Sequence, residues 1–367
     1  MQQQIIRGQG SLNGGNIAAL MARTGMQRPL LVCSARMERD FAARTGMRLP
    51  LFSGYHANPD LADAIAGADM YREMGCDGLI SVGGGSAMDT AKAVKAILLA
   101  EDMDAVRASR LPEGALPHIA IPGTAGTGAE ATPIAVVYEH NEKLSLDHPC
   151  LLPEGVLLDG ALLATLPLYH KKACAMDALC QGIESWWAVK ATPESRSHAE
   201  CAILGVLRNM DAYLAGDAAA ADAVLEAAYE SGCAIRISRT TAAHAMSYQI
   251  TKRLGYAHGH ACMLTLPHLW RHMGDAPVIG ELNALMGTED GAGLLQGLLC
   301  AADMLPTAMP DDATLDALAA SVNVERLGNH PEKLSTEALR AIYVQAFTPV
   351  EDDARDDLAS MWRHYAG

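Results

Sequence analysis

The sequence lacks several features that would assign it to common classes of protein. Its nine cysteines contain no C-x-x-C pair, so neither a zinc ribbon nor a disulfide framework is indicated. Scattered thiols of this kind are typical of a reducing cytoplasm. No apolar run approaches the roughly 18 residues that a membrane-spanning helix needs. Residues 1–7 lack the basic and then apolar pattern of a signal peptide, so we expect a cytoplasmic protein.

Positive charge is also scarce. The chain has 28 Lys and Arg against 43 Asp and Glu, a net charge of −15. This acidic balance argues against a nucleic-acid partner and against binding to anionic membranes. Half of the residues are hydrophobic and 19% are charged, as in an ordinary globular protein. A length of 367 residues predicts two domains, each large enough to bury a core.

Short apolar runs alternate with helical patterns up to about residue 165. The candidate strands are residues 30–33, 79–82, 119–121, 134–138 and 156–158, and the candidate helices are residues 16–24, 60–75 and 86–100. Such alternation predicts a parallel sheet covered by helices, with ligands at the carboxyl ends of the strands. The first domain is therefore expected to be an α/β domain over residues 1–165.

Helical patterns rich in Ala, Leu and Met fill the rest of the chain. They cover residues 171–189, 194–214, 217–250, 259–273, 289–304 and 335–347. The β-branched runs stop at about Leu166, and this shift in composition marks the predicted boundary. The second domain is expected to be all-α over residues 166–367.

A glycine turn joins the strand at residues 79–82 to the helix that follows it. The turn consists of Gly83, Gly84 and Gly85. Glycines before a helix N-terminus let a pyrophosphate approach the free N–H groups, where the helix dipole favours negative charge. Ser86 and Asp89 have the spacing of a helix-starting capping box. The glycines can also simply form a tight corner, and they lack the spaced G-x-G-x-x-G pattern of an ordinary Rossmann fold.

A second loop of small residues, residues 122–130, follows the strand at 119–121. Its Thr124, Gly126 and Thr127 can wrap a phosphate or lie against a flat ring, although such a loop can also be merely flexible.

Candidate metal ligands lie in the helical half. Asp177 and Gln181 are four residues apart and share one helix face, and His244 precedes His258 by fourteen residues. Histidine is the commonest ligand for transition metals. Taken singly, such an Asp is more often a surface residue and such a His more often a core residue. Their combination fits a metal site as well as it fits ordinary structural residues.

Together these motifs resemble the iron-containing (group III) alcohol dehydrogenases. The resemblance rests on Gly83 to Ser86 with Asp89 and Lys92, on residues 122–130, on residues 176–179 and on the block from His244 to His258. The motifs occur in family order across nearly the whole chain. The resemblance implies an α/β dinucleotide-binding domain and an all-helical metal- and substrate-binding domain, with the active site between them. The dehydroquinate synthase-like proteins share this architecture.

Residue roles follow from the resemblance, position by position. The glycine turn, Ser86 and Asp89 would bind the cofactor, with the pyrophosphate on the turn and Ser86. The other cofactor contacts would be Thr124, Gly126, Thr127 and, near the nicotinamide, Leu179. The metal ligands would be Asp177, Gln181, His244 and His258.

Two positions depart from the family pattern. Gln181 stands where the family usually has His, and Tyr248 stands where many members have another His. An amide oxygen is a poorer ligand than imidazole for Fe²⁺, the metal the family implies, or for Zn²⁺. Weaker affinity, a different metal or an empty site are all compatible with Gln181.

The segment from His244 to Tyr248, the segment from His258 to Ala261 and residues 144–149 resemble the branch that includes phosphonoacetaldehyde reductases. An anionic two-carbon aldehyde would need a basic contact. The candidates are Arg236, Arg239, Lys252 and Arg253, each of which can equally be a surface charge.

The cofactor preference can be argued at the end of the first core strand. The family often has Asp there, which binds the ribose 2′-hydroxyl and repels a 2′-phosphate. This chain has Ser34, and Arg36 can reach a phosphate with two hydrogen bonds. We therefore predict that NADP(H) is preferred over NAD(H).

The expected reaction is reversible hydride transfer between the nicotinamide and a small aldehyde, with a divalent metal polarising the carbonyl oxygen. His260 and Tyr248 are candidates for relaying the proton. The resemblance also implies a homodimer or a larger homo-oligomer. Two alternatives remain: a sugar-phosphate cyclase or lyase resembling dehydroquinate synthase, and a nucleotide-binding homologue whose metal site has decayed.

Overall fold

The computed structural model describes residues 3–112, 116–140, 142–323 and 327–366. The chain forms two compact units. One comprises Met1–Leu166 and Gly216–Gly232, and the other comprises Pro167–Ala215 and Cys233–Gly367. The boundary at Leu166 lies where the composition changes, but Gly216–Gly232 returns to the first unit. A division of the sequence at one point therefore does not describe the packing.

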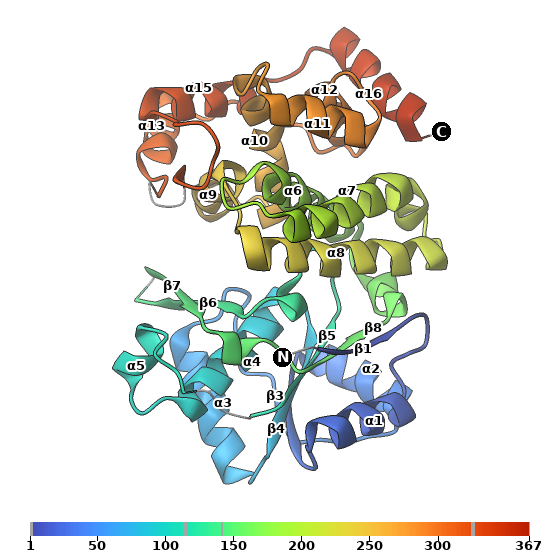
Figure 1. The fold of residues 1–367 in the computed structure, drawn as a ribbon, viewed down its shortest axis with the longest axis vertical. Coiled ribbons are helices and arrows are strands. Elements are labelled where there is room, and N and C mark those ends of the chain that lie inside the picture. Colours follow the sequence, from blue (N-terminus) through green and yellow to red (C-terminus); the bar gives the residue numbers. More distant parts are fainter. Residues whose placement is uncertain (1–2, 113–115, 141, 324–326, 367) are drawn as a thin grey trace. The chain divides into compact units, whose positions relative to one another are not determined.

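The first unit contains a six-stranded parallel sheet with the order β1-β8-β5-β4-β2-β3 (Figure 1). The strands are β1 (Gln4–Arg7), β2 (Pro29–Cys33), β3 (Leu51–Phe52), β4 (Gly78–Gly83), β5 (His118–Pro122) and β8 (Gly155–Leu158). The unit's α-helices are α1 (Gly14–Thr24), α2 (Ala35–Thr45), α3 (Leu61–Glu73), α4 (Gly85–Leu99), α5 (Met103–Arg107) and the larger part of α8 (Ala218–Ser238). The α/β fold and parallel sheet predicted from the sequence are confirmed.

Successive side chains of the central strands pack alternately into two separate hydrophobic cores, one on each face of the sheet. In β2, Leu30 and Val32 pack with α3 and α4, whereas Leu31 and Cys33 pack with α1 and α2. Successive side chains of a strand point to opposite faces, so a strand covered by helices on both sides must be apolar throughout. This explains why the central strands appear in the sequence as unbroken apolar runs.

The run at residues 134–138 does not join this sheet. It forms β6 (Ile134–Glu139), which pairs antiparallel with β7 (Glu142–Asp147) in a separate two-stranded sheet. Exposure alternates along β6, with Ala135 and Val137 fully buried, as expected of a strand with one covered face. Its assignment to the parallel sheet was wrong.

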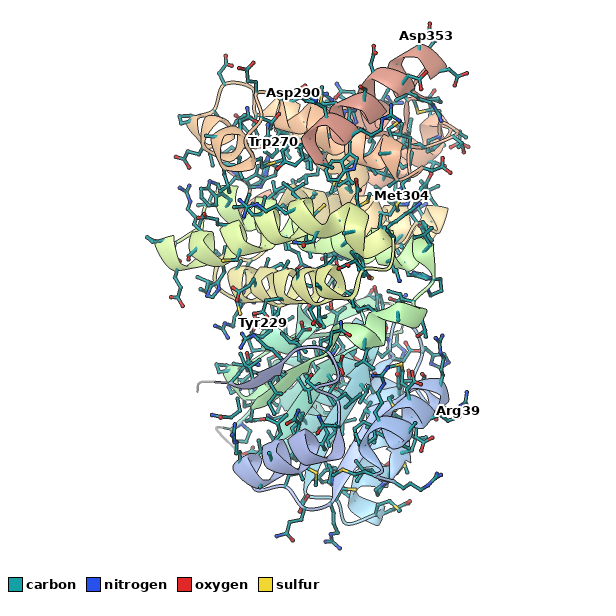
Figure 2. All side chains as sticks on the ribbon, turned by 90° about the vertical axis from the view of Figure 1, so that its right-hand side faces the viewer. Arg39, Tyr229, Trp270, Asp290, Met304 and Asp353 are labelled. Carbon is teal, nitrogen blue, oxygen red and sulfur yellow. The ribbon has the colours of Figure 1, made fainter. Side chains whose placement is uncertain are left out.

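Helices make up the regular structure of the second unit in its described residues. They are α6 (Leu168–Trp187), α7 (Pro193–Leu214), the end of α8 (Ala218–Ser238), α9 (Ala242–Gln249), α10 (His258–His272), α11 (Pro277–Met286), α12 (Gly291–Ala301), α13 (Asp312–Ala320), α15 (Thr336–Phe347) and α16 (Asp352–Ala366). Trp270, labelled in Figure 2, meets Trp187 edge to face at a centroid distance of 5.8 Å in the core of this unit. No helix of the described ranges is both long and apolar enough to cross a bilayer.

The helix predicted over residues 217–250 is broken in two. Arg239 has a left-handed backbone (φ 63°), which ends α8, and α9 begins at Ala242. The side-chain amide of Asn329 donates to the carbonyl oxygens of Ser238 (2.8 Å) and Thr240 (3.0 Å) and so satisfies the backbone at the break. The partner lies about ninety residues away in the sequence, so no local pattern signals the break.

The loop after β5 is held by a close approach of two backbones. Gly128 (φ 57°) lies against α8, and a Cβ atom there would be 2.5 Å from the Cα of Gly232 and 2.7 Å from the carbonyl oxygen of Ala228. Glycine at both positions is what permits this contact.

We expect Gly128→Ala to lower the thermal midpoint more than Gly25→Ala does. Gly25 is also left-handed (φ 77°), but no atom lies within 4 Å of its virtual Cβ. Gly25→Ala therefore costs only backbone strain, about 1–2 kcal/mol, whereas Gly128→Ala adds overpacking of about 1–3 kcal/mol. Calorimetry of the two variants measures the difference, and equal losses would contradict the packing role of Gly128.

Candidate active site

The two glycine-containing loops of the first unit lie against each other at the carboxyl ends of β4 and β5. A Cβ atom on Gly84 would be 3.2 Å from the Thr124 methyl group, and one on Gly85 would be 3.2 Å from the Thr127 methyl group. Gly83 has φ 146°, a backbone conformation that favours glycine. The predicted cofactor residues Gly83 to Gly85, Thr124 and Thr127 are thus brought together, with Gly126 in the same loop. The backbone of α4 begins in this cradle, where a phosphate would meet its free N–H groups.

The capping box predicted at the start of α4 is wrong. Gly84 is the N-cap, without a side-chain cap. The Ser86 hydroxyl instead donates to the carbonyl oxygen of Ala57, and an Asp89 carboxylate oxygen accepts from the backbone N–H of Val136 (3.1 Å). A helix that starts on glycine leaves its first N–H groups uncovered by side chains, which suits an anion site better than a capped start.

A buried lysine supports the second loop. Lys92 Nζ donates to the carbonyl oxygens of Ala129 (2.6 Å) and Ile134 (2.7 Å), and burial lowers the pKa of Lys92 to about 8. These bonds tie α4 to both ends of the segment 129–134.

Ser34 and Arg36 begin α2, after β2. The Ser34 hydroxyl accepts from the backbone N–H of Met37 (3.3 Å) as the N-cap of α2. Arg36 is exposed and donates to the carbonyl oxygen of Thr165 (3.2 Å). Its guanidinium therefore has further donors for a ligand.

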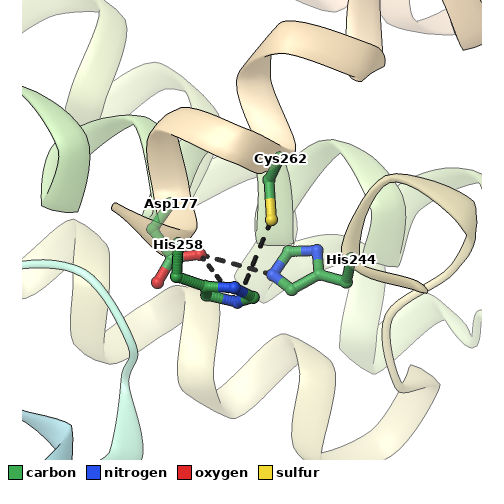
Figure 3. A group of neighbouring side chains, drawn as sticks. All are labelled: Asp177, His244, His258 and Cys262. Carbon is green, nitrogen blue, oxygen red and sulfur yellow. Dashed lines mark hydrogen bonds and ion pairs between the residues drawn. The ribbon is translucent and has the colours of Figure 1, made fainter. Parts of the chain in front are cut away.

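Four donor side chains converge in the helical unit (Figure 3). Asp177 on α6, His244 on α9, and His258 and Cys262 on α10 place one oxygen, two nitrogens and one sulfur within 4.8 Å of one another. His244 Nε2 is 3.3 Å and His258 Nε2 is 3.9 Å from Asp177 Oδ1. His258 is the most accessible of the four, with 35% of its side chain exposed.

Hydrogen bonds orient both imidazole rings toward this cluster. His244 Nδ1 contacts Glu184, which also accepts from the Thr241 hydroxyl (2.6 Å) and the Ala243 N–H (2.7 Å). The Ser247 hydroxyl donates to the carbonyl oxygen of His244, so it accepts from His258 Nδ1 (3.1 Å). With Nδ1 as the donor in each ring, both Nε2 lone pairs face the cluster, as in carboxylate–histidine–metal arrangements.

Two buried atoms test whether a metal fits. Asp177 Oδ1 and His244 Nε2 have no hydrogen-bond partner within the described part of the chain. Buried polar atoms are normally paired, and an unpaired one costs about 1–3 kcal/mol. A divalent cation would satisfy both atoms, so the residues present fit one.

The four side chains of the cluster strongly affect one another's pKa values. Burial would raise the pKa of Asp177, but His258 and His244 hold it below its usual value. Burial would lower the pKa of His244, yet Cys262, Glu184 and Asp177 raise it well above its usual value. The thiol of Cys262 is likewise buried, and the two histidines lower its pKa to about 7. Each of these shifts favours the charged form of the group, so Asp177 and Cys262 stabilise positive charge beside them.

The other predicted residues have more ordinary surroundings. Gln181 is buried one turn after Asp177, and Leu179 is fully buried on α6. The Tyr248 ring stacks on His258 at a centroid distance of 5.7 Å. His260 Nε2 donates to the carbonyl oxygen of Met304 (2.7 Å), and Nδ1 is 3.1 Å from the Tyr169 hydroxyl. Both nitrogens of His260 are thus engaged, and these contacts do not favour a proton relay.

The four basic candidates lie in the helical unit. Arg236 and Arg239 are half-buried, whereas Lys252 and Arg253 are exposed, and Arg253 binds the Gln249 amide oxygen (3.0 Å).

Sequence reasoning missed Glu184 and Cys262. The spacing of Cys262, one turn after His258 on a shared helix face, was the available signal for the second.

Two models of one protein family together cover most of the chain. The family model for iron-containing alcohol dehydrogenase matches residues 2–160, and that for the C-terminal region of the same family matches residues 172–347. The chain belongs to the iron-containing alcohol dehydrogenase family. It is accordingly an oxidoreductase that interconverts alcohols and aldehydes with a nicotinamide cofactor and a divalent metal. The cyclase alternative is thereby set aside.

Among characterised relatives, the chain is 36% identical to phosphonoacetaldehyde reductase of Streptomyces viridochromogenes over 77% of this chain and 80% of that one. It is 29% identical to 4-hydroxybutyrate dehydrogenase of Cupriavidus necator over 75% and 79%. Sulfoacetaldehyde reductase of Bifidobacterium kashiwanohense, solved with NAD⁺, superposes with a TM-score of 0.85 at 25% identity, covering 94% and 97% of the two chains. The predicted resemblance to the phosphonoacetaldehyde reductase branch is confirmed.

A glycine permits the close approach of α6 and α10, two of the helices that carry the cluster. A Cβ atom on Gly259 of α10 would overlap the carbonyl oxygen of Ala173 and the Asp177 Cβ on α6. We expect Gly259→Ala to separate His258 from Asp177 and to weaken metal binding at least tenfold. Metal titration of chelator-treated protein measures this loss.

The matched control is Gly280→Ala on α11, where nothing lies within 4 Å of the virtual Cβ. Alanine is the better helix former there, so this variant should keep its metal affinity and its stability. Unchanged metal affinity in Gly259→Ala would show that the helix spacing does not set the site.

Proposed function

We propose that this dehydrogenase reduces a short aldehyde bearing a strongly acidic group, of the phosphonoacetaldehyde or sulfoacetaldehyde type, with NADPH as the preferred cofactor. The observation that carries the proposal is the buried cluster of Asp177, His244, His258 and Cys262, found in a chain of this family. Two similar proteins named for two-carbon aldehydes with an anionic group support the substrate class.

Asp177, His244 and His258 would hold the metal, which the family implies to be Fe²⁺, with Zn²⁺ as the other candidate. When bound, a divalent ion supplies Lewis acidity toward a carbonyl oxygen. Gln181, one turn after Asp177 on α6, would offer its amide oxygen as a further ligand.

The protein's own residues provide orientation and exclusion of water. Glu184 and Ser247 fix the two imidazole rings through Nδ1, which removes rotational freedom before substrate binds. Asp177 and Cys262 are almost completely buried, and access remains on the side of His258. The stacked ring of Tyr248 borders that side, where its hydroxyl remains a candidate proton donor to the alkoxide.

The first test compares phosphonoacetaldehyde with propionaldehyde, a neutral aldehyde of similar size, by loss of reduced cofactor. We expect kcat/KM to be about ten- to a hundredfold higher for the anionic aldehyde, because a hydrogen bond to a charged group contributes about 1.5–3 kcal/mol. Equal values would contradict the substrate class.

His244→Ala should lower kcat with the anionic aldehyde by about a hundredfold or more while dinucleotide binding persists. The control is His272→Ala, at the exposed end of α10, which should retain wild-type turnover. Nucleotide binding is followed by fluorescence titration. Retained turnover in His244→Ala would contradict the metal assignment, and wild-type protein with neither metal nor turnover would favour the decayed-site alternative.

Cofactor choice is tested at α2. Wild-type protein should show a higher kcat/KM with NADPH than with NADH, and Arg36→Ala should reduce the NADPH value about tenfold or more while leaving the NADH value unchanged. Arg39→Ala, an exposed arginine on the same helix (Figure 2), is the matched control. Equal or better efficiency of the wild type with NADH would contradict the preference.

A further inference from the structure

The ligand set that the family resemblance implies is weak at one position. Gln181 offers a neutral amide where the family usually has an imidazole. The helical unit contains another donor close by: Cys262 lies one turn after His258 on α10 and is fully buried. Its sulfur belongs to the same group of atoms as the Asp177 oxygen and the two imidazole nitrogens.

The separations within this group match a coordination shell. Zinc–ligand bonds of about 2.0–2.3 Å in a tetrahedron place neighbouring ligand atoms about 3.3–3.8 Å apart. The structure has 3.3 Å between His244 Nε2 and Asp177 Oδ1, 3.9 Å between His258 Nε2 and Asp177 Oδ1, and 3.9 Å between Cys262 Sγ and His258 Nε2. Small side-chain adjustments would therefore bring all four atoms onto one ion (Figure 3).

The unsatisfied atoms in the cluster provide an independent observation. Asp177 Oδ1 and His244 Nε2 are each buried without a hydrogen-bond partner in the described ranges, and both lie in the space that the sulfur also borders. A cysteine that served only as a core residue would be surrounded by apolar side chains. Cys262 instead faces two imidazole rings whose other nitrogens are already committed to Glu184 and Ser247.

We propose that Cys262 binds the metal as a thiolate and compensates for the missing histidine at position 181. The inference rests on the proposed metal site and names its fourth ligand. As the sulfur–metal bond forms, the S–H bond breaks and its proton leaves to solvent, so no oxidant or reductant is required. A set of one carboxylate, two imidazoles and one thiolate suits Zn²⁺, which favours tetrahedral nitrogen and sulfur coordination.

The test uses the whole protein stripped of metal and titrated with Co²⁺, which reports thiolate coordination through a near-ultraviolet charge-transfer band. We expect one ion per chain and a band in the wild type. In Cys262→Ser the band should disappear and the affinity should fall at least tenfold. Cys180→Ser is the matched control, because Cys180 is a buried thiol of α6 outside the group of four donor atoms, and the band should persist.

A rescue variant separates ligand loss from misfolding. Cys262→Ser combined with Gln181→His should regain most of the Co²⁺ affinity without regaining the band, because imidazole then supplies the fourth donor. Failure of this rescue, or persistence of the band in Cys262→Ser, would overturn the inference.

The titration of the wild type distinguishes this inference from the proposed function. One Co²⁺ bound without a charge-transfer band would overturn the role of Cys262 and leave the metal-dependent reductase intact. No bound ion at all, together with turnover of phosphonoacetaldehyde by untreated protein, would overturn the metal site itself and this inference with it.

Discussion

A buried carboxylate needs a balancing charge. Helix α6 carries two buried carboxylates, seven residues apart. Asp177 and Glu184 both lie on the buried face of the helix, and His244 of α9 sits between them, with Nε2 near Asp177 and Nδ1 on Glu184. Removing one partner from such an arrangement would leave an uncompensated charge in the core. The position of α9, and with it the proposed metal site, therefore depends on the contacts of this imidazole with both carboxylates.

The proposed pyrophosphate site of the first unit is built from uncharged groups. Small residues let two loops approach closely: the atoms nearest to a Cβ placed on Gly84 or Gly85 belong to Thr124 and Thr127. The backbone N–H groups at the start of α4 are then available, and such groups can bind phosphate oxygens without a positively charged side chain. Lys92 holds the second loop in place by donating to the carbonyl oxygens of Ala129 and Ile134. The overall charge of −15 is thus compatible with an anionic cofactor.

The parts of the fold that the sequence predicted well are those decided by local pattern. The central strands are fully buried and so appear as continuous apolar runs, whereas β1 and β3 have four and two residues and half-exposed positions that leave little signal. The break between α8 and α9 and the uncapped start of α4 involve partners distant in the sequence, Asn329 and Ala57. Such features require the packing to be known first.

The candidate site likewise contains residues that the sequence predicted and residues that it did not, and the second group bears on the chemistry. Asp177, His244 and His258 were recognisable by type and order, but Glu184 resembles any helical glutamate and Cys262 any core thiol until α6, α9 and α10 are brought together. A thiolate in place of a neutral imidazole adds a second negative charge to the ligands and lowers the Lewis acidity of the ion they hold. A metal held by such a ligand set would polarise a carbonyl less strongly. Efficient reduction would then depend more on the contacts that the protein makes with the anionic group of the proposed substrate. Such a dependence favours a reductase with a narrow substrate range.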